Sequence, residues 1–256
     1  MTPSKRDRRQ FLTRMLVASG ALLLTSCDRL SRSEWLTKIL AGGEKLSEVA
    51  QHLVTSRKSM AQEFTAADLS PVFRSNGTSN PDNPEYQTLA VNAFADYRLQ
   101  VAGLVEQPGA FSLAELRALP SRSQITRHDC VEGWSAIGKW KGARLSALLE
   151  RVRPTPDARY VVFFCADPMG SQGARYYESI DLEDAYHPQT ILAYELNDQP
   201  LPIGNGAPIR VRIERQLGYK MAKYIMGIEL VANFSNIEDG KGGYWEDQGY
   251  EWYAGI

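Results

Sequence analysis

One stretch of the chain, residues 126–140, gathers side chains that do chemistry around a single cysteine: TRHDCVEGWSAIGKW. Cys130 has His128, Asp129 and Glu132 close by in sequence, and no second cysteine lies near it. The spacing therefore fits neither a CxxC redox pair nor a zinc cluster. Three interpretations stay open from residue types alone: a reactive thiolate, a metal ligand, or a structural cysteine packed like a small hydrophobe.

The charged neighbours of this cysteine argue against simple packing. Arg127, His128, Asp129 and Glu132 are costly to bury unless they are paired or face a site. Arg127 and His128 are expected to lower the thiol pKa and favour the thiolate. His128, Asp129 and Glu132 are candidates for catalysis through proton handling. Alternatively, Asp129 and Glu132 form ion pairs with Arg127 or Lys139.

A second stretch, residues 201–225, has the composition of an anion site. Its turn is rich in glycine and proline, and Arg210, Lys220 and Lys223 follow. Glycine frees backbone amides, and an arginine can hold a phosphate with two hydrogen bonds. The alternative is a basic surface loop, because no Walker or dinucleotide-binding pattern is present.

The composition is that of an ordinary globular protein. The chain has 256 residues, 43% hydrophobic and 23% charged, with a formal net charge of -1. A dedicated nucleic-acid binder usually has a strongly basic face, so we expect no nucleic-acid partner. Three cysteines are too few for a disulfide scaffold.

The first 27 residues have the layout of an export signal. Arg8 and Arg9 precede an apolar run over 15–24, which is short for a membrane span. The segment RRQFL resembles a twin-arginine signal, and LTSC, ending at Cys27, resembles a bacterial lipobox. We therefore predict a signal peptide over 1–27, a periplasmic location and a lipid on Cys27 that holds the protein at the membrane surface. The alternative is an uncleaved membrane anchor. Export after folding would suit a cofactor inserted in the cytoplasm.

The pattern of the remaining chain predicts an α+β fold. We expect a helical tether and loop over 28–80 and one domain over 81–256. The expected elements are a helix at 28–58, a loop at 70–88, a strand at 97–105, a short helix capped by Ser112 and Glu115, a turn leading into an amphipathic helix at 140–152, and strands at 158–166, 190–197, 207–214 and 224–234. Strands and helices mix without a regular β-helix-β alternation, which disfavours a doubly wound sheet.

Two segments together resemble a known family. HDCVEGWSAIGKWKGARLSALL (128–149) and NGAPIRVRIERQLGYKMAKYI (205–225) are similar to the molybdopterin domain of the sulfite oxidase family. Within that family they resemble the catalytic subunits of bacterial periplasmic methionine-sulfoxide reductases. GYWEDQGYEWYAGI (243–256) resembles the end of that domain. The resemblance implies a sulfite-oxidase-type molybdopterin-binding domain of mixed sheet and short helices over 81–256, with molybdenum-molybdopterin as cofactor.

The resemblance also implies roles for individual residues. Cys130 would be the thiolate that binds molybdenum, which soft sulfur ligands suit. Gln87 stands where the family has glutamate, and Cys165 where it has threonine. The complete set of implied cofactor contacts is Asn83, Tyr86, Gln87, Cys130, Cys165, Asn205, Arg210, Lys220, Met221, Ala222 and Lys223.

The implied activity is oxygen-atom transfer, first of all the reduction of a small-molecule or protein-bound S- or N-oxide. Sulfite oxidation is the second interpretation. Two others stay open: a metal-free lipoprotein binding module, and a thiol enzyme with Cys130 as nucleophile. The sequence has no CxxCH haem motif and resembles the molybdenum domain alone. A membrane b-type cytochrome is therefore the expected electron partner.

Overall fold

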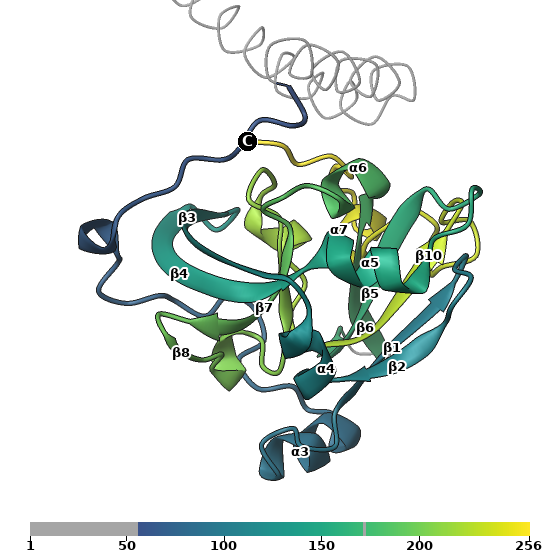
Figure 1. Ribbon diagram of the computed structural model, residues 1–256, viewed down its shortest axis with the longest axis horizontal. Helices are drawn as coiled ribbons and strands as arrows, with labels where there is room; N and C mark the ends of the chain where they lie inside the picture. Colours follow the sequence, from purple (N-terminus) through teal and green to yellow (C-terminus); the bar gives the residue numbers. More distant parts are fainter. Residues whose placement is uncertain (1–55, 171–172) are drawn as a thin grey trace, which may run out of the picture. The chain divides into compact units, whose positions relative to one another are not determined.

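The computed structural model describes residues 56–170 and 173–256, which form two β-sheets and several short helices (Figure 1). The predicted signal segment, Cys27 and nearly all of the predicted helix at 28–58 lie outside the described residues. In the part of the chain that the structure describes, we find no helix with the length and apolar character needed to cross a membrane.

The helices are short. They are η1 (Ala66–Asp68), α3 (Pro84–Val91), α4 (Leu113–Ala118), α5 (Leu145–Val152), α6 (Leu182–Ala185), η2 (Ile203–Asn205), η3 (Gly218–Lys220) and α7 (Tyr244–Asp247). The strands are β1 (Arg98–Gly103), β2 (Gly109–Ser112), β3 (Ser121–Cys130), β4 (Trp134–Arg144), β5 (Tyr160–Met169), β6 (Ala174–Asp181), β7 (Ile191–Leu196), β8 (Gln199–Pro200), β9 (Arg210–Arg212) and β10 (Ile225–Val231).

The first sheet has the strand order β2-β1-β10-β5-β6. Its β1–β10 pair is parallel and its other pairs are antiparallel. Strand β5 is the buried strand predicted at 158–166, and it is rich in β-branched and aromatic residues because consecutive side chains, on both of its faces, are buried. This sheet supplies much of the main hydrophobic core, which α5 also joins.

The second sheet carries the cysteine. Its order is β3-β4-β7-β8, and β9 also pairs with β7. Strands β3 and β4 form a long antiparallel hairpin whose register runs from Ser121 opposite Ala143 to Cys130 opposite Trp134. The hairpin curves over one side of the domain in Figure 1. Cys130 therefore lies at the tip of a long hairpin that many backbone hydrogen bonds hold.

Several predictions from local sequence chemistry are confirmed. The domain is α+β, and α4 begins at the predicted capping box of Ser112 and Glu115. The predicted amphipathic helix is α5, whose apolar face is fully buried.

Three element predictions are wrong in part. The expected loop at 70–88 ends early, because Asn83 caps a helix that has Pro84 in its first turn. Residues 140–144 belong to β4 rather than to a turn. The strictly alternating strand predicted at 207–214 is reduced to Arg210–Arg212, and all three of its residues are buried. Alternation of residue types was misleading there because the arginines are paired inside the protein.

Gly142 permits the close approach of β4 and β7. A Cβ atom at this position would overlap the carbonyl oxygen of Leu192. We expect Gly142→Ala to lower the free energy of unfolding by about 1–3 kcal/mol, the usual cost of overpacking. Urea denaturation of the purified protein measures this change. Gly109→Ala is the control, since its added Cβ would be 3.6 Å from the Phe111 ring, an ordinary contact. Equal stability of the two variants would contradict the prediction.

Candidate active site

Cys130 lines a pocket of about 410 Å³, called here the Cys130 pocket. The hairpin tip turns through Gly133, whose φ of 83° suits glycine, and the Gly133 N–H donates to the Cys130 carbonyl at 3.0 Å. Val131 and Glu132 line the pocket beside the cysteine. The hairpin thus presents the half-buried thiol to a cavity of the size that small-molecule and cofactor sites have.

The thiol has an elevated pKa. Burial is the main cause, and the carboxylate of Glu132 raises the pKa further, whereas Arg210 lowers it. The sequence-based expectation that Arg127 and His128 lower the thiol pKa is therefore wrong. Arg127 is exposed and pairs with Asp129 at 2.9 Å, and burial makes the neutral form of His128 favourable. Cys130 without a metal is a protonated thiol at neutral pH, and a metal ion has to displace that proton.

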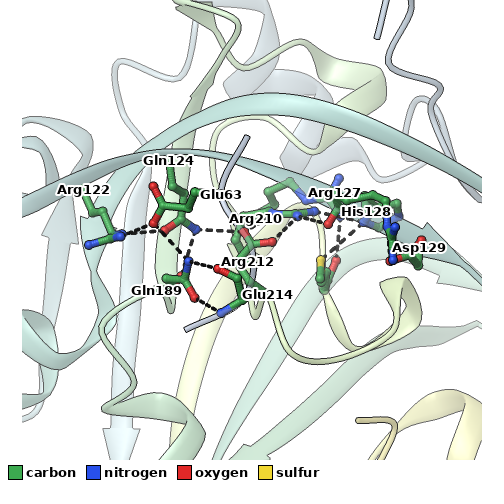
Figure 2. Close-up of polar contacts among 12 residues, drawn as sticks. Glu63, Arg122, Gln124, Arg127, His128, Asp129, Gln189, Arg210, Arg212 and Glu214 are labelled. Carbon is green, nitrogen blue, oxygen red and sulfur yellow. Dashed lines mark hydrogen bonds and ion pairs between the residues drawn. The ribbon is translucent and has the colours of Figure 1, made fainter. Parts of the chain in front are cut away.

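His128 belongs to a buried polar network beneath the hairpin (Figure 2). Arg212 donates to both carboxylate oxygens of Glu214, at 2.9 and 2.6 Å, and to Nδ1 of His128 at 2.9 Å. Gln124 donates to the same Glu214 carboxylate at 2.8 Å. Burial and then Arg212 lower the pKa of His128 well below its ordinary value. Nδ1 accepts a hydrogen bond, so the imidazole is neutral with its proton on Nε2.

Trp140 packs against two buried arginines. Its ring centroid lies 5.2 Å from the Arg210 guanidinium carbon and 4.5 Å from that of Arg212. Burial and the neighbouring Arg212 lower the pKa of Arg210 to about 9, so the Arg210 guanidinium stays charged at neutral pH. Trp140 is fully buried, as its residue type predicts, and stabilises the cations through its ring face.

The two acidic neighbours of Cys130 have different surroundings. Asp129 accepts from Arg127 and from the Ser135 hydroxyl, and it does not line the Cys130 pocket. Glu132 does line it, and accepts from the Trp134 indole N–H at 3.0 Å. Of the four residues predicted to be catalytic, Cys130 and Glu132 therefore reach the pocket, while His128 and Asp129 support the hairpin.

Three of the implied cofactor contacts, Asn83, Tyr86 and Gln87, do not line the Cys130 pocket. Asn83 caps α3 and donates to the Ala166 carbonyl at 3.1 Å. Tyr86 is fully buried and donates to the Ala207 carbonyl at 2.7 Å. Gln87 donates back into the preceding loop. These side chains fasten α3 to the domain, and none of them lines the pocket.

The loop before α3, rather than α3 itself, contributes to the lining of the Cys130 pocket. Asn76, Gly77 and Thr78 line the Cys130 pocket. Sequence reasoning missed them because they lie in a polar loop without a chemical motif. The one local signal is Gly77, whose φ of 58° marks a backbone position that favours glycine.

Strand β5 contributes a carboxylate rather than a thiol. Cys165 is buried in the core, does not line the pocket, and both it and Cys130 are free thiols. Asp167, two residues further on, does line the pocket, and burial raises its pKa to about 6. Sequence reasoning missed Asp167 because a lone aspartate before proline is usual in a turn.

The three predicted anion-binding cations of residues 201–225, Arg210, Lys220 and Lys223, lie in three different environments. Lys223 lines the pocket, and its ammonium donates to the carbonyls of Asn76, Thr78 and Gly204 at 2.5, 2.6 and 3.1 Å. Burial and Arg210 lower the pKa of Lys223 to about 7. Met221 also lines the pocket, whereas Ala222 is buried in the core.

Arg210 holds two parts of the backbone of residues 201–225 together. It donates to the carbonyls of Asn205 and Met221 at 3.2 and 3.1 Å. Asn205 itself is buried and does not line the pocket. Arg210 and Asn205 therefore shape the backbone behind the wall.

Lys220 lies in a separate buried cluster. Its ammonium pairs with Glu178 at 2.5 Å and Glu246 at 2.6 Å, and all three side chains are at most 1% exposed. Burial raises the pKa of Glu178 well above its ordinary value. This arrangement leaves Lys220 engaged by carboxylates, and it does not line the Cys130 pocket.

Two unsatisfied atoms test whether a pterin fits. Asn76 Oδ1 and Asp167 Oδ1 are buried acceptors with no hydrogen-bond partner, and both residues line the Cys130 pocket. Buried acceptors require donors, and the aminopyrimidinone edge of a pterin carries N–H groups. Cys130 offers a soft ligand for molybdenum. The residues present therefore fit a molybdenum-pterin.

Asp167 makes a pH-dependent prediction for the cofactor-free protein. In the folded protein the pKa of Asp167 is about 6, above the ordinary value of 3.8, so between these two pH values the folded state binds more protons than the unfolded state. The free energy of unfolding therefore falls as the pH rises from about 3.8 through about 6. Relative to Asp167→Asn, the parent should lose about 2–3 kcal/mol of unfolding free energy between about pH 4 and 7. Denaturation at several pH values measures this, with exposed Asp157→Asn as control. Parallel curves for the parent and Asp167→Asn would refute it.

Known proteins match this chain over the part that contains Cys130 and most of the residues that line its pocket. Residues 86–237 match the oxidoreductase molybdopterin binding domain. A protein of Azospira oryzae, provisionally named protein-methionine-sulfoxide reductase subunit YedZ1, is 38% identical over 97% of this chain and 87% of its own length. The protein-methionine-sulfoxide reductase catalytic subunit MsrP of Xanthomonas axonopodis pv. citri is 40% identical over 53% of this chain, and the match spans only 45% of MsrP.

A solved structure supports the fold. The sulfane dehydrogenase SoxCD of Paracoccus pantotrophus aligns with a TM-score of 0.50 and 20% identity over 59% of this chain and 45% of its own. The predicted family resemblance and α+β fold are confirmed by these matches. The chain belongs to the oxidoreductases with a molybdopterin-binding domain, within the sulfite oxidase family.

Proposed function

We propose that this oxidoreductase holds a molybdenum-pterin in the Cys130 pocket and reduces methionine sulfoxide in proteins. The observation that carries the proposal is the Cys130 thiol at the hairpin tip, which opens onto a pocket with two unsatisfied acceptors and a buried lysine. The names of the YedZ1 and MsrP relatives support a sulfoxide as substrate. The chain spans less than half the length of MsrP, so the activity of the whole MsrP protein is carried over here as a proposal.

The net reaction takes a sulfoxide, two electrons and two protons to a thioether and water. The bound molybdenum supplies two-electron oxygen-atom transfer. Cys130 contributes a sulfur ligand after losing its thiol proton. Asp167 is a carboxyl group in the pocket that can hold a proton there, because its pKa of about 6 lies close to neutral pH; Glu132 also lines the pocket.

The pocket favours a neutral oxide over sulfite. No arginine is among the described residues that line it, and Lys223 already donates to three carbonyls. Arg210 and Arg212 are fully buried in the layer beneath. An anionic substrate would need uncommitted cations near the metal, whereas a sulfoxide needs only a polar oxygen site and space for its apolar groups.

Removal of the proposed molybdenum ligand tests the function. Cys130→Ala should lower sulfoxide reductase activity with an artificial electron carrier by at least about 100-fold, since even changes outside the metal ligands cost 10–100-fold. X-ray absorption should show one sulfur neighbour of molybdenum fewer in the loaded variant than in the loaded parent protein. Cys165→Ala is the matched control, because it removes a core thiol. Full activity of Cys130→Ala would exclude the proposal, and parent protein free of molybdenum would favour a binding module or a thiol enzyme.

Export and electron supply form the second part of the proposal. The twin-arginine and lipobox resemblances at 4–27 support a periplasmic protein held at the membrane through Cys27, with a membrane b-type cytochrome as electron donor. Cys27→Ala should move the protein from the membrane fraction to the soluble periplasmic fraction. Quinol-driven activity should fall while activity with an artificial carrier stays at the parent level. A variant that remains in the membrane fraction would contradict lipid anchoring.

A further inference from the structure

An aromatic wall, defined here as Tyr219, Trp245 and Tyr250, forms one side of the Cys130 pocket. The rings of Trp245 and Tyr250 stack with centroids 5.2 Å apart, and Tyr219 meets Tyr250 edge-on at 5.3 Å. Tyr219 is buried, Trp245 is partly buried and Tyr250 is 43% exposed. The wall therefore runs from the interior of the pocket to the protein surface.

The wall is held rigidly by its neighbours in sequence. Tyr219 donates from its hydroxyl to the Glu251 carbonyl at 2.6 Å, which fastens the segment that carries Tyr250. Lys220, next to Tyr219, pairs with Glu246, next to Trp245, at 2.6 Å. These contacts order the rings before any ligand arrives, so binding on them costs little conformational entropy.

Two large apolar side chains of the pocket lining are exposed at the surface, in addition to the exposed Glu132. Val131, beside Cys130, is 45% exposed and lines the pocket together with the aromatic wall. Scattered exposed apolar residues are common on proteins, but Val131 and Tyr250 are exposed large apolar side chains at one opening. The methyl and methylene groups of a methionine sulfoxide can pack on aromatic rings, so this opening suits that side chain and the backbone on either side of it.

We propose that Trp245 and Tyr250 are specificity-determining residues that hold the methionine sulfoxide side chain and flanking backbone of an extended polypeptide. This inference rests on the proposed function and deepens it. A small sulfoxide fits within the interior of the pocket and makes no contact with the exposed face of Tyr250. An extended polypeptide with the same sulfoxide crosses the opening and packs on that face.

Steady-state kinetics with two substrates test this inference. The substrates are an unstructured peptide with one internal methionine sulfoxide, and dimethyl sulfoxide. For Tyr250→Ala we expect KM for the peptide to rise about three- to tenfold, the range that aromatic packing contacts support. The rise in KM for dimethyl sulfoxide should be clearly smaller than that for the peptide, and kcat should change less than KM for either substrate. Tyr250→Phe keeps the ring and should behave as the parent does.

Matched controls separate a local effect from damage to the enzyme. Tyr186 is 42% exposed on a different part of the chain, so Tyr186→Ala removes a tyrosine of equal exposure. All rates are expressed per bound molybdenum. An unchanged peptide KM in Tyr250→Ala, or an equal loss for both substrates, would overturn the inference while leaving the proposed function intact. A parent protein that reduces neither sulfoxide would overturn the proposed function and this inference with it.

Discussion

Two positive charges buried beneath the β3–β4 hairpin constrain the rest of the active site. An arginine enclosed in a protein is very unfavourable without partners that replace its hydration. Arg212 finds them in Glu214 and His128, and Arg210 in two backbone carbonyls, with the Trp140 ring against both. These partners come from β3, β4 and the segment around β9, so the charges lock those elements together. Because β3 ends at Cys130, the position of the thiol depends on this polar layer.

The division of labour around the cysteine follows from that constraint. The groups next to Cys130 in sequence mainly build its support, because His128 is used by Arg212 and Asp129 by Arg127 and Ser135. The groups that face the pocket are Val131 and Glu132 beside the cysteine and residues of distant segments, including Asp167 and Lys223. His128 and Asp129 therefore position the thiol, and what binds beside it depends on both adjacent and remote residues.

Sequence reasoning succeeded where the chemistry is local. The Ser112–Glu115 capping box and the apolar face of α5 each depend on a few adjacent residues. It failed where partners are remote. Lys220 looked like a phosphate ligand, but its carboxylates lie 42 and 26 residues away in sequence.

Residue types with a structural use do not by themselves separate support from cofactor binding. Asn83 and Tyr86 cap and anchor α3 in the structure, and their contact with a pterin stays a prediction. Asn76 carries no motif and gains its place in the pocket only through the path of its loop, which the Lys223 ammonium fixes by gathering three carbonyls. Such a path depends on tertiary contacts that periodicity and spacing do not encode.

The cluster of Lys220, Glu178 and Glu246 couples three segments that lie far apart in sequence. Glu178 belongs to β6, Lys220 to η3 and Glu246 to α7. While α7 is undocked, the buried ammonium of Lys220 lacks one of its two carboxylates. A buried charge without its partner is very unfavourable, so the docking of α7 and the completion of the core are cooperative.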